Sequence, residues 1–180
     1  MVLQSVVSTK THGTSGDFPI DLPQPPATPG VECRQAGSLP GGASGDYQLV
    51  FTFSQPLSSV DSASVSCGSV ASSGFAPGSN QYTLNLTGEN SCNMTYVMVT
   101  LNNVNDSAGG HSDSVSGTMG LLLGDTSSDG VVNSADITQT RRQSGNVTDS
   151  SNFREDVTLD GVINSADITL VRRQSGNALP

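Results

Sequence analysis

Oxygen-bearing side chains recur at the same spacing in two copies of one segment in the C-terminal third of the chain. Residues 125–146 and 156–177 align without a gap at an offset of 31 residues, and 16 of the 22 positions are identical. Each copy places side-chain oxygens at positions one, three, five, nine and twelve of a loop. These residues are Asp125, Ser127, Asp129, Asn133 and Asp136 in the first copy, and Asp156, Thr158, Asp160, Asn164 and Asp167 in the second.

The donor set in both copies suits a hard cation. Ca²⁺ takes about six to eight oxygen ligands, and a loop of about 12 residues with Gly at its sixth position supplies them in this order. Gly130 and Gly161 occupy position six, and Val131 and Val162 at position seven offer a backbone carbonyl. Neither loop contains Cys or His, which argues against Zn²⁺, and Mg²⁺ prefers a tighter octahedron. We therefore expect two bound Ca²⁺ ions, one in each loop.

A short helix is expected after each loop, where it would hold the last ligand in place. Asp136–Ser144 and Asp167–Ser175 each precede a glycine, the residue that commonly ends a helix, and both carry Arg near the C-terminal end, where a positive charge is favourable. Ser134 and Ser165 are predicted to cap the helix starts. The helix that usually precedes an EF-hand loop is missing, because Met119–Leu123 is too short to form it.

These repeats resemble the type I dockerin domain over residues 124–177, in the segments GDTSSDGVVNSADITQTRRQ and EDVTLDGVINSADITLVRRQ. The resemblance implies two half EF-hands of the F-hand type, each a loop and a helix. Such modules bind two Ca²⁺ ions and dock onto a cohesin module, which attaches secreted enzymes, often polysaccharide hydrolases, to a scaffold. The hydroxyls of Ser127 and Thr158 at position three depart from the family, where Asp or Asn is commoner.

The resemblance also implies which residues contact the partner. In dockerins these are the residues just before the last ligand and the basic pair on the following helix. The near-identical copies imply a pseudo-twofold surface that could bind a cohesin in either orientation. The corresponding positions here are Ser134, Ala135, Arg141 and Arg142, with their copies Ser165, Ala166, Arg172 and Arg173.

The chain before the repeats is predicted to be β structure. Apolar and polar residues alternate in Tyr47–Phe53 and Tyr82–Leu86, and Val2–Thr9 and Tyr96–Leu101 are further candidate strands. Short alternating runs broken by Gly, Pro, Asn and Ser are typical of an antiparallel β-sandwich. The segment 21–30 (DLPQPPATPG) contains four prolines and is predicted to be a loop or a polyproline stretch between early strands.

The segments LVFTFSQPLSSVDSASV and YVMVTLNNVNDSAGG resemble bacterial immunoglobulin-like domains, over about residues 47–110. That resemblance implies a spacer or stalk. We therefore predict an all-β, Ig-like sandwich over residues 1–123, followed by a small α module over residues 124–180.

Catalysis has little support in the sequence. His12 and His111 are the only histidines, neither lies in a metal-binding HExxH motif, and no GxSxG nucleophile motif is present. The stretch GGHSDS around His111 is predicted to be a loop. We expect no catalytic residues and no enzyme activity in this chain, although a parent or partner protein could be a glycoside hydrolase.

Three cysteines, Cys33, Cys67 and Cys92, leave at least one thiol unpaired within a monomer. In an exported protein the preferred pair is Cys67–Cys92, and the alternative is that all three are small buried apolar residues.

Composition narrows the classes of partner and the location. The net charge of −9 argues against nucleic-acid binding, which needs clustered Lys and Arg. No apolar run reaches the ~18–20 residues that a membrane helix needs. The low charge and the abundance of hydroxyl side chains are typical of a secreted or extracellular protein, with its export signal expected upstream of this sequence.

Two functions from different classes remain open at this point. The first is a non-catalytic module that binds two Ca²⁺ ions and assembles with a cohesin-like module or another extracellular protein, in connection with polysaccharide degradation. The alternative is a structural C-terminal Ca²⁺ clip or stalk of a large secreted or cell-surface protein that has no cohesin partner.

Overall fold

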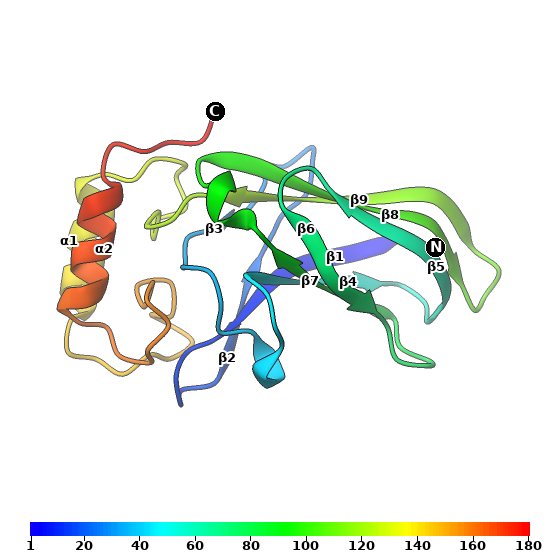
Figure 1. Cartoon of the computed structure of the whole chain (residues 1–180), viewed down its shortest axis with the longest axis horizontal. Coiled ribbons are helices and arrows are strands. Elements are labelled where there is room, and N and C mark those ends of the chain that lie inside the picture. The colour runs from blue at the N-terminus through cyan, green and yellow to red at the C-terminus, as the bar shows by residue number, and fades with distance from the viewer.

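The chain forms two β-sheets with a pair of helices at one end (Figure 1). The computed structural model describes the backbone of residues 1–180 and every side chain except that of Asn90. The first sheet has the strand order β2-β1-β4-β7-β6. Its strands are β1 (Leu3–Thr11), β2 (Asp17–Asp21), β4 (Tyr47–Phe53), β6 (Ser69–Gly74) and β7 (Gln81–Thr87).

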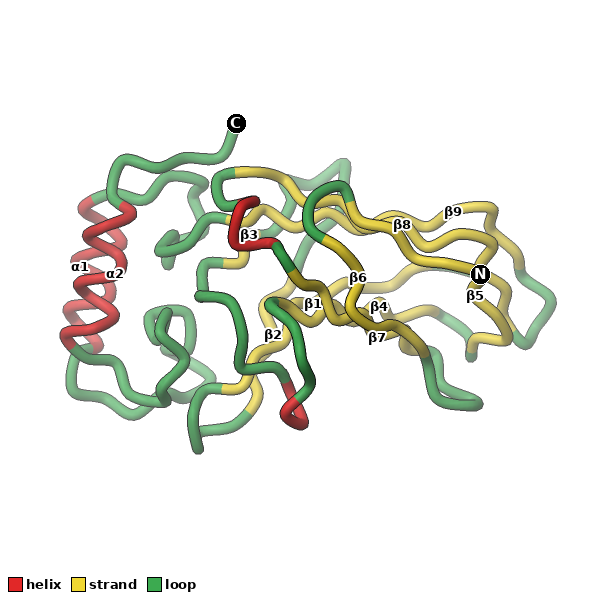
Figure 2. The backbone as a smooth tube through the Cα atoms, in the orientation of Figure 1, coloured by secondary structure: helices red, strands yellow, loops and turns green.

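The second sheet has the order β3-β9-β8-β5. Its strands are β3 (Val31–Glu32), β5 (Leu57–Val65), β8 (Thr95–Asp106) and β9 (His111–Leu121). All strand pairs are antiparallel except β3 with β9. Two short 3-10 helices, Pro40–Gly42 and Glu89–Cys92, lie in loops, and the α-helices are α1 (Ser134–Gln143) and α2 (Ser165–Gln174). Figure 2 shows the strands and the α-helices as separate regions joined by loops.

Alternation of side chains explains how the two sheets pack. In β4 the side chains of Leu49, Phe51 and Phe53 are fully buried, and the intervening residues are half-buried. Val97 and Val99 on β8 belong to the same apolar core from the opposite sheet. The prediction of a β-rich N-terminal part followed by two helices is confirmed, and β4 has the predicted bounds. The immunoglobulin-like assignment stays a prediction.

The prediction of a loop around His111 was wrong. His111 and Asp113 lie at the start of β9, where His111 pairs with Asn105 of β8, and the turn lies at Ser107–Gly110 instead. This half of β9 carries mostly polar side chains, so it lacks the apolar alternation that marks a strand. The prediction also omitted β5, for the same reason, since Leu57 is its one buried residue.

The proline-rich segment 21–30 forms no helix, and β2 ends at its first residue. Its loop assignment is therefore confirmed. The side chain of Gln24 fixes the segment to the second sheet, because its Oε1 accepts a hydrogen bond from the amide of Thr118 at 2.6 Å.

Cys67 and Cys92 form a disulfide, as the sequence favours for an exported protein. The third cysteine, Cys33, is a buried free thiol. Burial raises the pKa of the Cys33 thiol to about 11, so it stays protonated at neutral pH. Cys33 therefore packs as a small apolar residue.

Reducing this disulfide is expected to lower the free energy of unfolding of the sandwich by about 3 kcal/mol. The bridge closes a loop with a sequence separation of 25 residues, so it reduces the conformational entropy of the unfolded chain. Urea titration followed by tyrosine fluorescence measures this, because all three Tyr lie in the strands of the sandwich and the chain has no Trp. A Cys67→Ser/Cys92→Ser variant that still responds to dithiothreitol would contradict the prediction.

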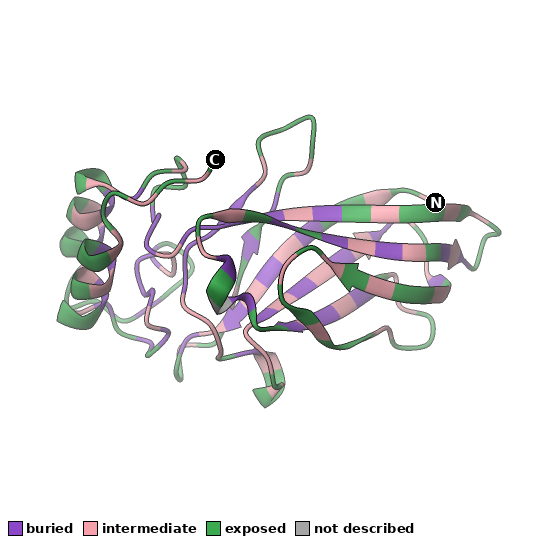
Figure 3. Cartoon of the chain, turned by 45° about the horizontal axis from the view of Figure 1, so that its top comes forward, coloured by how far each residue is buried: buried purple, intermediate pink, exposed green. Residues whose placement is uncertain are grey.

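A second, smaller core joins the two parts of the molecule. It consists of Val31, Leu122, Val132, Val157 and Val171, which are all buried. Val31 lies on β3 and Leu122 directly follows β9, while the other three belong to the repeats. Figure 3 shows buried residues continuing from the sheets into the loops that lead to the helices. The repeats therefore complete their core with residues of the β-rich part.

Candidate metal centre

The starts of α1 and α2 are built around the ninth and twelfth positions of the two loops. The side chain of Asn133 accepts a hydrogen bond from the amide of Ala135 at 2.7 Å, and the carboxylate of Asp136 accepts one from the amide of Asn133 at 2.8 Å. Asn164 and Asp167 repeat this reciprocal cap on α2. The prediction that Ser134 and Ser165 cap the helices was therefore wrong, because each serine is already the first helical residue.

The second loop brings three carboxylates together. Asp156, Asp160 and Asp167 each offer an oxygen, and these oxygens lie within 4.8 Å of one another. Asp156 and Asp167 are buried, and Asp160 is exposed. Leu159, with φ 64°, and Gly161, with φ 89°, turn the backbone so that amides point inward. The amides of Asp160 and Gly161 donate to Asp156 at 3.2 and 3.0 Å.

The other oxygen positions of the second loop face the same carboxylates. The hydroxyl of Thr158 donates to Asp167 at 2.8 Å, so its proton points at a carboxylate and its lone pairs remain available. The amide nitrogen of Asn164 donates to Asp160 at 3.1 Å and to the carbonyl of Val162 at 3.2 Å. Positions three, seven and nine of this loop therefore lie next to the carboxylate cluster.

The first loop repeats the backbone hydrogen bonds of the second, but its position-three hydroxyl bonds differently and the loop is more exposed. The amide of Gly130 donates to Asp125 at 2.9 Å, and the amide of Ser127 donates to Asp136 at 2.9 Å. The hydroxyl of Ser127 donates to Asp125 at 3.3 Å. Its three carboxylates lie within the described part of the chain but do not form a group as close as that of the second loop. They belong to Asp125, Asp129 and Asp136. Asn133 reaches the carbonyl of Val131 at 3.3 Å, as in the other copy.

The two first-position carboxylates differ in their electrostatics. Burial raises the pKa of Asp125 above its ordinary value, and the amides of Gly130 and Asp129 offset only part of this effect. Burial acts on Asp156 in the same direction, but hydrogen bonds from His12 and Thr148 outweigh it, so the pKa of Asp156 is lowered. Asp156 is thus held in the charged form that a cation requires.

The two repeats are related by an approximate twofold arrangement. Val131 in the first loop forms an antiparallel bridge with Ala178, which follows α2. Val162 in the second loop forms the matching bridge with Val147, which follows α1. The helices α1 and α2 pack side by side (Figure 1). The eight positions expected to contact a partner are all exposed on these helices: Ser134, Ala135, Arg141, Arg142, Ser165, Ala166, Arg172 and Arg173.

The structure adds contacts between the sandwich and the second loop that the sequence analysis missed. His12 Nδ1 lies 2.9 Å from Asp156 Oδ2, and both side chains are fully buried. The amide of Gln35 donates to the carbonyl of Val157 at 3.0 Å. Arg154, between the repeats, donates to the carbonyls of Val31 and Asp125 at 3.2 and 3.1 Å. His12 and Asp156 are 144 positions apart, so no local pattern pointed to their contact.

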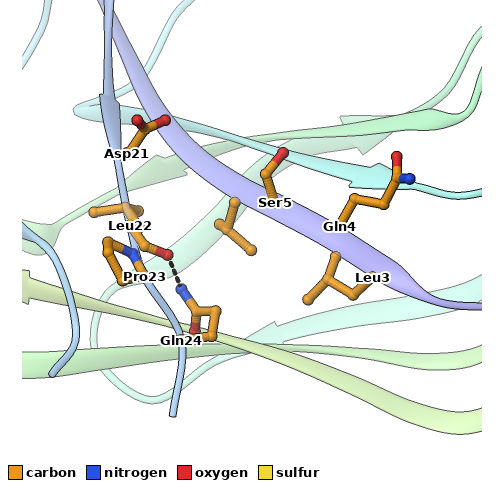
Figure 4. A pocket seen from close by; sticks show the side chains of 8 residues that line it. Leu3, Gln4, Ser5, Asp21, Leu22, Pro23 and Gln24 are labelled. Carbon is orange, nitrogen blue, oxygen red and sulfur yellow. Dashed lines mark hydrogen bonds between the residues drawn. The ribbon is translucent and has the colours of Figure 1, made fainter. Parts of the chain in front are cut away.

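One cavity lies away from the loops. It has a volume of about 480 Å³ and lies between β1 and the proline-rich segment. Figure 4 shows Leu3, Leu22 and Pro23 beside Gln4, Ser5, Asp21 and Gln24 in its wall. Asp21 is the one carboxylate among these residues, so the cavity does not contain the carboxylate pair of a glycoside hydrolase. Among the described residues, no helix is both long and apolar enough to cross a membrane.

Comparison with known proteins identifies the C-terminal part. The family model described as the dockerin type I domain matches residues 123–174. This part of the chain is therefore a type I dockerin domain that follows a β-rich N-terminal region. Dockerin domains are non-catalytic modules that bind calcium and take part in cohesin-type protein–protein assembly, and they occur in extracellular cellulosome proteins. Neither the curated proteins nor the solved structures contain a match to the chain.

Proposed function

We propose that residues 124–180 bind two Ca²⁺ ions and dock the sandwich of residues 1–123 onto a cohesin module, in a secreted system that degrades polysaccharides. One observation carries this proposal. The dockerin match covers both loops, and in the second loop the carboxylates at positions one, five and twelve converge within 4.8 Å.

The donor set fits Ca²⁺. Each loop combines three carboxylates with the carbonyl at position seven and side-chain oxygens at positions three and nine, and none of these donors is sulfur or nitrogen. In the second loop Asp156 and Asp167 are buried close together, which is unfavourable without a cation between them. Bound Ca²⁺ would neutralise the carboxylates and fix each loop against the helix that follows it.

The charge distribution supports a partner surface on the helices. Of the seven basic side chains, Lys10 and Arg34 are buried. Arg154 is half-buried at the junction, the region where the repeats contact the sandwich. The other four are the exposed Arg pairs of α1 and α2. On a protein with a net charge of −9, each pair forms a small basic patch in the last turn of its own helix, and each patch suits an acidic or hydrogen-bond-accepting partner.

The alternative of a structural clip has less support. A clip would use the repeats only to close the end of the sandwich, so its helices need not present matched surfaces. Here the sandwich covers the second loop and leaves both predicted partner surfaces exposed (Figure 3).

A direct test measures Ca²⁺ and cohesin binding together. Calorimetric titration of Ca²⁺ into the metal-free protein is expected to show two ions per chain. Immobilised type I cohesin modules are then expected to capture the protein in Ca²⁺ and to release it in EDTA. A stoichiometry of zero, or the absence of Ca²⁺-dependent capture by every cohesin in a broad panel, would overturn the proposal.

Removing one Arg pair is expected to have a small effect on cohesin binding, and removing both a large one. An Arg141→Ala/Arg142→Ala variant should lose about twofold in affinity, because the copy on α2 still allows one of two orientations. The variant that also carries Arg172→Ala/Arg173→Ala should lose about 100-fold, since two charged contacts are missing in either orientation. Surface plasmon resonance against a captured cohesin measures both changes.

The control for these variants is Gln81→Ala, an exposed position on β7 far along the chain from the helices. Its affinity should equal that of the wild type. A full loss of binding in Arg141→Ala/Arg142→Ala, or in Arg172→Ala/Arg173→Ala alone, would contradict the proposed equivalence of the two surfaces.

A further inference from the structure

The turn between β1 and β2 packs directly against the second loop. The amide of Gly13 donates to the carbonyl of Leu159 at 3.0 Å, and the hydroxyl of Ser15 donates to the carbonyl of Gly161 at 3.3 Å. A Cβ atom on Gly13 would lie 2.3 Å from the carbonyl oxygen of Asp160, and Gly13 has φ 50°. Only glycine therefore fits here, and the sandwich reaches the backbone of the loop around positions four to six.

The side chain of His12 extends this contact to a proposed Ca²⁺ ligand. His12 Nε2 lies 3.1 Å from Arg34 Nη1, and a guanidinium can only donate. Nε2 must therefore accept, which places the proton of a neutral ring on Nδ1. Nδ1 then donates to Asp156 Oδ2 across 2.9 Å.

Arg34 itself has little freedom to move. Its Nε and Nη2 donate to the carboxylate of Glu32, each at 2.8 Å, and Nη1 also donates to the carbonyl of Phe18 at 2.8 Å. His12, Arg34 and Glu32 are all fully buried. The orientation of the imidazole is thus set by the sandwich rather than by the loop.

The first loop has no counterpart of this contact. Asp125 receives the amides of Asp129 and Gly130 and the hydroxyl of Ser127, all from its own loop. Asp156 receives the matching amides of Asp160 and Gly161, and in addition His12 and Thr148. Among the described side chains, His12 is thus the sandwich residue that reaches a first-position carboxylate.

We propose that the β-sandwich completes the second Ca²⁺ site, with His12 as a positioning residue that holds Asp156 in its ligating orientation. A group that donates to a metal-binding carboxylate fixes its direction and typically affects metal affinity by about 10- to 100-fold. The two sites are therefore unequal, and Ca²⁺ in the second loop tightens the junction with the sandwich. This inference rests on the proposed Ca²⁺ function of the loops.

Site-resolved Ca²⁺ titration tests the proposal. The amide protons of Gly130 and Gly161 each donate to the first carboxylate of their own loop, so their NMR signals report the two loops separately. In His12→Leu the Gly161 signal should require about 10- to 100-fold more Ca²⁺, while the titration of Gly130 should stay unchanged. His12→Asn should restore much of the affinity, because the Asn side-chain nitrogen can take the place of Nδ1.

The outcomes separate this inference from the function on which it rests. Equal weakening of both loops in His12→Leu, or no weakening in either, would overturn the positioning role. Failure of His12→Asn to recover affinity would also count against it. If neither glycine of the wild-type protein responds to Ca²⁺, the proposed function itself fails.

A measurement on the unmodified protein applies even if His12→Leu does not fold. Binding and junction stability must affect each other reciprocally. Hydrogen exchange at the amide of Gly13 should therefore slow in Ca²⁺, while the amide of Ser107, which bonds to Pro56 in the β8–β9 turn, should exchange at the same rate. Unchanged exchange at Gly13, while the Gly130 and Gly161 signals both show bound Ca²⁺, would overturn the proposal.

Discussion

Chelation of Ca²⁺ is expected to unfold residues 124–177 while the β-sandwich keeps its fold. The buried core of this part has five residues, of which Val31 and Leu122 come from the sandwich side, so the repeats contribute little apolar burial of their own. Each ion stabilises the folded form by about 4 kcal/mol when free Ca²⁺ is about 1,000 times its dissociation constant. Without that contribution, the repulsion between the loop carboxylates should cost more free energy than the burial of the small core provides.

Two spectroscopic signals report separately on the helices of the dockerin domain and on the sandwich. Far-ultraviolet circular dichroism should lose the helical signal of α1 and α2 in EDTA. Tyrosine fluorescence should change little, because Tyr47 and Tyr82 are buried in the core between the sheets. Readdition of Ca²⁺ should restore the helices, and an excess of Mg²⁺ in its place should not. Circular dichroism and melting that are identical with and without EDTA would contradict the prediction.

Replacing Arg34 with Met is expected to lower the free energy of unfolding by about 3–5 kcal/mol. Arg34 forms an ion pair with Glu32, and both side chains are fully buried. Met keeps much of the apolar stem but leaves the Glu32 carboxylate buried without its counter-charge. Urea unfolding followed by tyrosine fluorescence measures the loss, and Arg141→Met on the exposed face of α1 is the matched control with no expected change.

The pH dependence of this loss identifies its cause. Burial raises the pKa of Glu32, but the charge and hydrogen bonds of Arg34 outweigh it and lower the pKa to about 2. In the wild type this contribution to stability is therefore complete above the ordinary pKa of 4.5 and is lost as the pH falls toward 2. In Arg34→Met the carboxyl should take up a proton on folding, so stability should rise as the pH falls.

The difference in the free energy of unfolding between the wild type and Arg34→Met should consequently be smaller at pH 4 than at pH 7. The double variant Glu32→Gln/Arg34→Met removes the buried charge altogether and should recover part of the loss at pH 7. A deficit that is independent of pH, and equal in the single and double variants, would show that lost packing rather than an unpaired charge is responsible.

How much the sequence predicts depends on how local the determining contacts are. The twelve expected ligand positions lie in two short loops, and the structure places positions one, five and twelve of the second loop together. Strand β4 was predicted with its observed bounds because its apolar residues alternate fully. Strand β5 was missed because its pairing with β8, rather than its own apolar residues, holds it at the edge of the sheet.

The helix caps show a similar limit over a shorter distance. Both Ser134 and its neighbour Asn133 are residue types that cap helices well. Asn133 is the residue that caps α1. Its extended backbone directs its side chain at the amide of Ala135, and its own amide donates to Asp136. The loop geometry decides this, and composition alone does not.

Residues close together in the chain define the two loops and their oxygen-bearing side chains, and they predict a dockerin-like module over residues 124–177 after a β-rich part. These features depend on residues a few positions apart or on alternation within a strand. Two features become visible only in the folded chain: the shared core of the sandwich and the dockerin domain, and the contact of His12 with Asp156. A contact between residues 144 positions apart depends on the packing of entire sheets, so it leaves no periodic pattern in the chain from which it could be predicted.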